Sequence, residues 1–281
     1  MAGPFSDLAY TRAHARRRPA AGRRAALAAI ALLVIVALGY GGYRGVRLVM
    51  HRLHAQGTAS SHAVTPTQLG SLTRVSPNTT QEPAAAAADT PTPVAAPPAG
   101  AILPVPYTVQ APNGNWRVFE NACEEASTLM YHDFLEGDRR SQLPPGEVDP
   151  QLRAMEAWQV KNWGAERDLT LDRTGQFAHA YWGYQYQVIP LTQDSVKQAI
   201  AAGHPVVIPV MTHSLQNPHY GPNTVYHELV IKGYTNAGVV TNDPGVQEGK
   251  DWFYSWTIMF SAVDAQAIRM SQGRVGLILT K

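Results

Sequence analysis

The only cysteine of the chain, Cys123, is followed by a histidine and an aspartate whose order suits thiol chemistry. A cysteine becomes an effective nucleophile when a histidine takes its proton and a third group holds the imidazole in one orientation. His227 opens the apolar segment HELVIKGY, after which the chain turns at TNAG and returns as VVTNDPG. Such a hairpin would carry Asp243, sixteen positions after His227, back toward that histidine. Asn242 is an alternative orienting residue, because an amide can fill the same role.

The segment NACEEASTLMYHDFLEG predicts a helix that begins just before Cys123. Asn121 can cap it, Glu124 follows three residues later as in a capping box, and Gly137 ends it. The expected buried stripe consists of Ala126, Leu129, Met130 and Phe134. Cys123 would lie in the first turn, where the helix dipole and the unpaired amides favour a thiolate, although Glu124 and Glu125 oppose it.

The other segments between residues 101 and 281 predict an α+β domain. ILPVPYTVQ reads as an extended segment that its two prolines confine to a sheet edge or a docking strand. Two further helices are expected over 151–163 and 194–202. Four runs rich in β-branched residues are expected as strands: HPVVIPVM, YHELVIKGY, GVVTNDP and RVGLILT. Helices come first and mainly antiparallel strands later, which is the order of an α+β fold.

Taken together, VPYTVQAPNGNW, CEEASTLMYHDF, HELVIKGYTNAGVVTNDPG and FYSWTIMFSAV resemble the cysteine peptidase family 39-like group, which includes the bacteriocin-leader-processing peptidases. The resemblance covers residues 103–265. It implies a papain-like α+β fold with the nucleophile at the start of a central helix and its partners on the following sheet. It assigns Cys123 as the nucleophile, His227 as the base and Asp243 as the orienting residue.

The resemblance also implies a glutamine ahead of the cysteine as an oxyanion donor, and Gln110 in PYTVQAP matches that motif. Gln110 lies thirteen residues before Cys123, which is a longer spacing than in the leader-processing enzymes. The backbone amide of Cys123 is expected to be the second donor.

Other interpretations of these residues are open at the level of sequence. A lone cysteine can be an inert core residue. The histidine-rich stretch with His213, His219, His227 and Glu228 could suggest zinc, but its spacing fits no H-E-x-x-H pattern. We therefore expect no metal and no cofactor. The segment QNPHYGPN is expected to lie over the cleft, with His219 or Tyr220 touching substrate. The aromatic residues that could line the cleft or belong to the core are Trp116, Trp252, Tyr254 and Trp256.

The first hundred residues have a different composition. Residues 1–24 form an arginine-rich tail that we expect in the cytoplasm, and residues 25–47 include an uncharged apolar run long enough for one membrane-spanning helix. A cleavable signal peptide is the alternative, but its apolar region is shorter and ends at a small-residue cleavage site. Six arginines precede the run and three follow it, which places the C-terminal part outside the cytoplasm. Residues 48–100 are rich in Pro, Ala and Thr and predict a disordered linker.

Composition and motifs together predict a single-pass cell-membrane protein whose extracytoplasmic domain, residues 101–281, is a monomeric cysteine peptidase acting on peptide or cell-wall peptide bonds. The chain is 45% hydrophobic with a formal net charge of +2, so no nucleic-acid partner is expected. Two alternatives share the fold: a catalytically inactive module that binds peptide or cell wall, and a transglutaminase-like acyltransferase.

Overall fold

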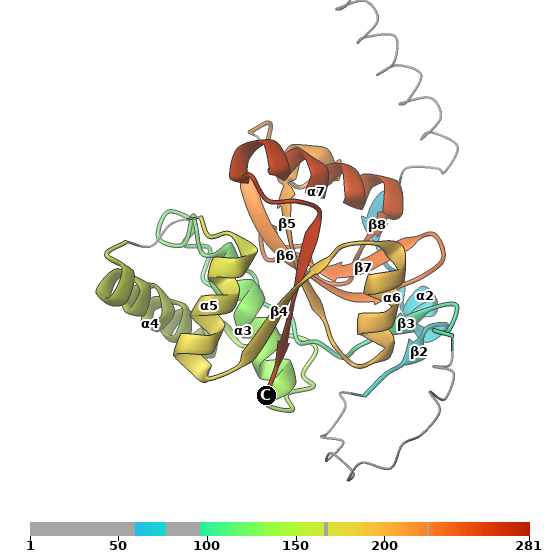
Figure 1. Ribbon diagram of the computed structural model, residues 1–281, viewed down its shortest axis with the longest axis horizontal. Helices are drawn as coiled ribbons and strands as arrows, with labels where there is room; N and C mark the ends of the chain where they lie inside the picture. Colours follow the sequence, from blue (N-terminus) through green and yellow to red (C-terminus); the bar gives the residue numbers. More distant parts are fainter. Residues whose placement is uncertain (1–59, 77–95, 166–167, 224) are drawn as a thin grey trace, which may run out of the picture. The chain divides into compact units, whose positions relative to one another are not determined.

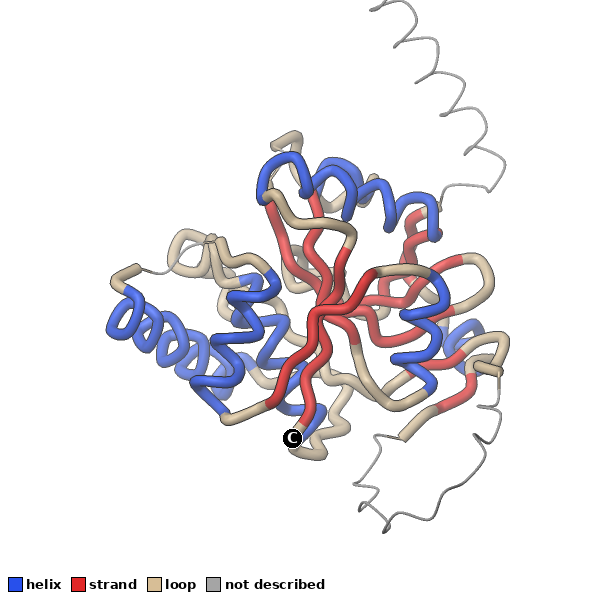
Figure 2. Tube along the Cα trace, in the orientation of Figure 1, coloured by secondary structure: helices blue, strands red, loops and turns tan. Residues whose placement is uncertain are grey.

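A twisted, mainly antiparallel sheet forms the centre of the computed structural model, which describes residues 60–76, 96–165, 168–223 and 225–281 (Figures 1 and 2). Its strands are β1 (Ser61–Ala63), β2 (Thr73–Arg74), β3 (Ala101–Ile102), β4 (Gln185–Pro190), β5 (Val206–Met211), β6 (Tyr226–Tyr234), β7 (Gly238–Asn242), β8 (Trp252–Ser255) and β9 (Val275–Thr280). The main order is β1-β8-β7-β6-β5-β9-β4, and β3 joins β6 while pairing in parallel with β2. This mixture of helices and antiparallel sheet confirms the predicted α+β class.

The helices flank this sheet. They are α2 (Pro66–Gly70), α3 (Cys123–Leu135), α4 (Pro145–Trp163), α5 (Leu171–Trp182), α6 (Gln193–Ala201), the 3-10 turn η1 (Thr212–Leu215) and α7 (Trp256–Met270). Figure 1 shows α3, α4 and α5 as one group on the left of the sheet, with α7 above it and α6 on the right. The four strands expected from β-branched runs are present as β5, β6, β7 and β9.

Helix α3 is buried along most of its length, and its first residue, Cys123, is buried as well. The four residues of the predicted stripe are fully buried, and the Ser127 hydroxyl donates to the backbone carbonyl of Glu228 on β6 at 3.0 Å. The predicted cap is wrong: the N-cap is Ala122, and no side chain caps the helix. Glu124 does not reach back to the helix start, because its carboxylate accepts from the Leu169 N–H at 2.8 Å instead.

The hairpin β6–β7 crosses the core and is buried over both strands. Its register pairs Val230 with Asn242 and Ile231 with Thr241, with a shift between Ile231 and Gly233. Both strands are buried on both faces of the sheet, which explains why they lie in its middle. The residue after β7 therefore returns close to the first residues of β6.

Several elements differ from the sequence expectation. Helix α4 begins six residues before the predicted start, with Pro145 in its first turn, where a missing N–H costs nothing. Helices α5 and α7 and strands β4 and β8 were not predicted. Helix α5 carries the usual signals at both ends, since Thr170 accepts from the Arg173 N–H and Gly183 has a φ of 83°.

The linker prediction for residues 48–100 is wrong for residues 60–76. Strand β1 pairs antiparallel with β8, and β2 pairs with β3, so this segment covers two sheet edges. Backbone hydrogen bonds at a sheet edge need no apolar side chains, which explains how a polar segment can be ordered there. Residues 60–76 therefore pair with the sheet of the domain that was expected to begin at residue 101.

The predicted membrane anchor, residues 25–47, lies outside the described residues. Within the described ranges, none of the helices combines the length and the apolar character of a membrane span.

Candidate active site

Helix α3 presents Cys123 as its first residue, on the wall of a pocket of about 450 Å³. The first N–H groups of a helix have no partners within the helix, so the backbone amide at this position is suited to bind an anion. The cysteine is 3% exposed. Its sulfur is thus held at a pocket wall with little contact to bulk water.

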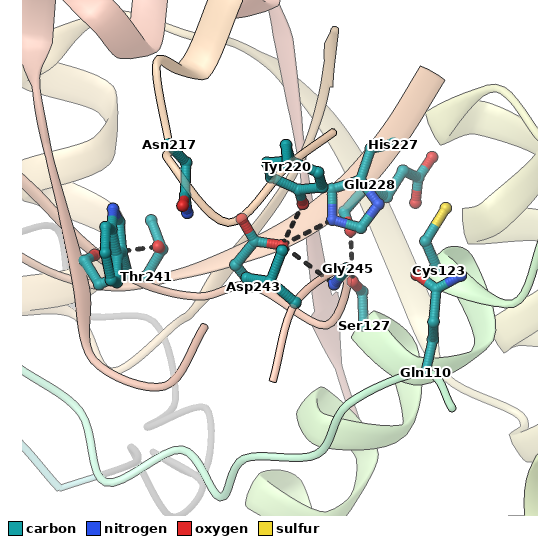
Figure 3. A network of polar contacts seen from close by, with 12 residues as sticks. Gln110, Cys123, Ser127, Asn217, Tyr220, His227, Glu228, Thr241, Asp243 and Gly245 are labelled. Atoms are coloured by element: carbon teal, nitrogen blue, oxygen red, sulfur yellow. Dashed lines mark hydrogen bonds and ion pairs between the residues drawn. The ribbon is translucent and has the colours of Figure 1, made fainter. Parts of the chain in front are cut away.

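Strand β6 supplies His227 and the end of β7 supplies Asp243. Nε2 of His227 lies 2.8 Å from Oδ1 of Asp243, so the hairpin brings the two residues together as the sequence predicted. Because Nε2 faces the carboxylate, Nδ1 is the ring nitrogen left for another partner. His227 lines the same pocket as Cys123, and Figure 3 shows its imidazole between Asp243 and Cys123.

The carboxylate of Asp243 is held by three further donors. Oδ1 also accepts from the Tyr220 hydroxyl at 2.6 Å and the Gly245 N–H at 3.1 Å (Figure 3). Oδ2 accepts from the Tyr254 hydroxyl at 2.9 Å. Burial by itself would raise the pKa of Asp243, but the charge of His227 and these hydrogen bonds hold it below its usual value. The residue is therefore a fixed carboxylate that orients the imidazole.

Asn242, the alternative orienting residue, makes its hydrogen bonds elsewhere. Its amide nitrogen donates to the backbone carbonyls of Val105 and Pro106 at 3.1 and 3.0 Å. These bonds attach the extended segment after β3 to the hairpin. The structure thus favours Asp243 over Asn242 as the partner of His227.

Sγ of Cys123 lies 2.9 Å from Oε2 of Glu124, which is hydrogen-bond distance. Burial raises the pKa of Cys123 well above its usual value, and a negative charge on Glu124 raises it further when that residue is ionised. A hydrogen bond from the Glu228 backbone acts in the opposite direction. Burial and the neighbouring acid therefore oppose the thiolate that the first turn of the helix favours.

Gln110 lies on the pocket wall but holds the loop in front of α3. Its amide nitrogen donates to the carbonyls of Phe119 and Glu120 at 2.8 and 3.2 Å, which uses both amide hydrogens. Its Oε1 is buried without a hydrogen-bond partner among the described residues. The oxyanion-donor role implied by the resemblance would require one of the two bonds to open.

The remaining sequence candidates separate into pocket and core residues. Trp116 and Tyr220 line the pocket, whereas Trp252, Tyr254 and Trp256 are buried. His219 contacts Glu248 at 3.2 Å. Among the described residues, no cluster of histidine, cysteine and acidic side chains could hold a metal ion.

Three residues of this site have functions that the sequence did not reveal. Tyr220 was expected to touch substrate, and the sequence left Tyr254 as either a cleft residue or a core residue. Both hydroxyls donate a hydrogen bond to Asp243. Gly245 is the third, and the only sequence signal for it is its place in NDPG. A loop tyrosine and a strand tyrosine, 34 positions apart, converge only through the tertiary structure.

We expect Gly245→Ala to disturb the histidine directly. A Cβ at this position would overlap the Tyr220 hydroxyl and lie 2.8 Å from Cε1 of His227, so the imidazole must shift. A shift of about 1 Å in a catalytic group lowers turnover by roughly 100-fold. Gly221→Ala is the control, since its Cβ would have open space. Equal loss in both variants in a peptidase assay would contradict this role of Gly245.

Comparison with known proteins adds the family. The model of the Peptidase C39 like family matches residues 102–264, which is more than half of the chain. The chain belongs to this family. The resemblance seen in the sequence is thereby confirmed, and membership favours a cysteine peptidase function in general.

Solved structures and curated proteins give less support for the family. A solved structure from Bacillus anthracis, described as a C39-like peptidase, is 16% identical, with a TM-score of 0.44, covering 64% of this chain and 96% of that one. This likeness is too low to support a conclusion about the site. No curated protein matches the sequence.

Proposed function

We infer that the chain is a cysteine peptidase that cleaves peptide or amide bonds, with Cys123 as nucleophile, His227 as base and Asp243 as orienting residue. The observation that carries this proposal is the His227–Asp243 contact of 2.8 Å at the pocket that also holds Cys123. A binding module would have no need for a carboxylate with four donors behind a pocket histidine.

The reaction starts from the thiol. As Sγ of Cys123 attacks the substrate carbonyl carbon, the thiol proton passes to Nδ1 of His227, and Asp243 stabilises the resulting imidazolium. The backbone N–H of Cys123 stabilises the negative oxygen of the tetrahedral intermediate. The carbon–nitrogen bond then breaks, His227 gives the proton to the departing amine, and a thioester remains on Cys123.

Water completes the cycle. His227 takes a proton from a water molecule that attacks the thioester, and the carboxylic acid leaves as the thiol is restored. If an amine takes the place of water, the same site carries out acyl transfer. The loop that contains Tyr220 lies at the pocket and binds Asp243, so it can connect substrate binding with the orientation of His227.

The location of the enzyme is part of this proposal. The arginine-rich start and the apolar run of residues 25–47 support a single membrane anchor with the peptidase domain outside the cytoplasm. Peptides or cell-wall peptides would be the substrates available there.

Trapping of the acyl-enzyme tests the function. After incubation with peptide and wall preparations, intact-mass measurement is expected to show a covalent adduct on the wild type that hydroxylamine removes. The His227→Ala variant is expected to lack it. Free acid as the product indicates hydrolysis, and amide formed with an added amine indicates an acyltransferase. Substrate binding without any adduct or product would overturn the peptidase proposal and favour the binding module.

A further inference from the structure

Glu124 contacts the sulfur of Cys123 but has no role in the mechanism above. Its side chain is buried, with Oε2 2.9 Å from Sγ and Oε1 accepting from the Leu169 N–H at 2.8 Å. Since Oε1 already accepts a hydrogen bond, a proton on this carboxyl group belongs on Oε2. That oxygen is the one that faces the sulfur.

The surroundings of Glu124 are acidic. The titratable and charged groups around Glu124 and its neighbour Glu228 are Cys123, Glu125, Asp168, Tyr226, His227 and Arg269. The arginine is half-exposed and pairs with Asp168 at 3.4 Å. Within the described residues, neither Glu124 nor Glu228 forms an ion pair with a cationic side chain.

Two buried carboxyl groups without a cation cannot both be charged at low cost. Glu228 accepts hydrogen bonds from Tyr226 at 2.9 Å and from Thr174 at 3.2 Å, which favour its charged form. Burial raises the pKa of Glu228 to about 8. Burial also raises the pKa of Glu124 well above its usual value, and the charge of Glu228 raises it further.

We propose that Glu124, as a neutral acid, donates a hydrogen bond from Oε2 to the sulfur of Cys123 and stabilises the thiolate that forms when His227 takes the thiol proton. With a proton on Oε2, the contact runs from oxygen to sulfur and leaves the S–H free to point at His227. Glu124 keeps its own proton throughout. The contribution of Glu124 to turnover rests on the proposed role of Cys123 as nucleophile. The effect of Glu124 on the reactivity of the sulfur can be measured without a turnover assay.

This role has a defined pH dependence. Below the pKa of Glu124 its O–H stabilises the thiolate, and above that pKa its negative charge repels the thiolate. Glutamine is the matched replacement, because its oxygen can accept from Leu169 while its amide nitrogen donates to the sulfur without titrating. Leucine has a similar size but offers no donor.

Alkylation of the full-length chain by iodoacetamide tests the proposal. A carbon–sulfur bond forms as iodide leaves, and the mass reports Cys123 alone because the chain has one cysteine. We expect Glu124→Gln to react at the wild-type rate while the wild-type Glu124 is protonated, and about tenfold faster once rising pH has ionised the wild-type carboxylate. Glu124→Leu is expected to react about tenfold more slowly than wild type at pH 6, because the donor is lost.

Glu228→Gln provides the second arm. Removing the negative charge of Glu228 lowers the pKa of Glu124. The rate ratio of the double variant Glu124→Gln/Glu228→Gln to Glu228→Gln should therefore begin to rise at a lower pH than the ratio of Glu124→Gln to wild type. Glu136→Gln, at the other end of α3, is the control and should follow the wild type.

A ratio between Glu124→Gln and wild type that stays constant with pH would overturn the proposal, since a purely structural role changes the rate equally at every pH. If Glu124→Leu does not fold, the Gln profile decides by itself. A chain that alkylates as expected but cleaves nothing contradicts only the peptidase function, and a chain that cleaves with a constant ratio contradicts only the role of Glu124.

Discussion

Cys123→Ala is expected to remove essentially all peptide hydrolysis while the protein remains folded. Loss of a nucleophile lowers turnover by about 10⁵-fold or more in enzymes that work through a covalent intermediate. The side chain is small, and its polar contacts are a hydrogen bond with Glu124 and one with the Glu228 backbone, so the fold should lose only about 2 kcal/mol. Turnover with peptide substrates and thermal unfolding measure the two effects separately.

Ser127→Ala is the matched control for this variant. Ser127 lies one turn further along α3 and donates to the Glu228 carbonyl at 3.0 Å, but it is not a reacting group. It should keep most of the activity. Equal turnover by wild type and Cys123→Ala would remove Cys123 as the nucleophile.

Asp243→Asn is expected to lower turnover by about 10⁴-fold, because the amide can hold His227 in the wrong tautomer and cannot stabilise the imidazolium. The variant also leaves donors from Tyr220, Tyr254 and Gly245 with fewer acceptors, which should cost about 1–3 kcal/mol of stability. Single-turnover kinetics and chemical denaturation give the two values.

The loss of folding stability at acidic pH offers a second measurement on this variant. The pKa of Asp243 is below its usual value in the folded protein, so its charge stabilises the fold above the unfolded pKa of about 3.9. This contribution is lost as the pH falls through the folded-state value. Asp243→Asn should lack that part of the acid unfolding.

Asn242→Ala separates orientation of the histidine from stability of the hairpin. It removes the donors to the Val105 and Pro106 carbonyls but not the Asp243 carboxylate. We expect lower stability and nearly unchanged activity per folded molecule. Wild-type turnover in Asp243→Asn, or a larger loss of turnover in Asn242→Ala, would contradict the assignment of the orienting residue.

The site contains two buried carboxyl groups with opposite properties. Asp243 has four donors within 3.1 Å and a lowered pKa, whereas Glu124 accepts from the Leu169 amide, contacts the sulfur of Cys123 and has a raised pKa. The number of donors, and not burial, separates them. One carboxyl group can therefore act as a fixed anion behind the histidine while the other keeps a proton next to the sulfur.

Local sequence patterns determined the elements that carry the site. The apolar spacing of the helix at Cys123, the β-branched runs of β6 and β7 and the turn between them depend on neighbours in the chain, so their types and the approach of Asp243 to His227 could be predicted. The tail, anchor and substrate predictions rest on sequence alone, and the first two concern residues outside those that the structure describes.

Only the tertiary structure decided how the side chains are used. Tyr220, Tyr254 and Gly245 reach Asp243 from three different segments, and Gln110 turns to the loop carbonyls before α3. The protonation of Cys123 and Glu124 depends on burial and on Glu228 across the interface between α3 and β6. Such effects arise between residues distant in sequence, and a local pattern does not contain the distances that set them.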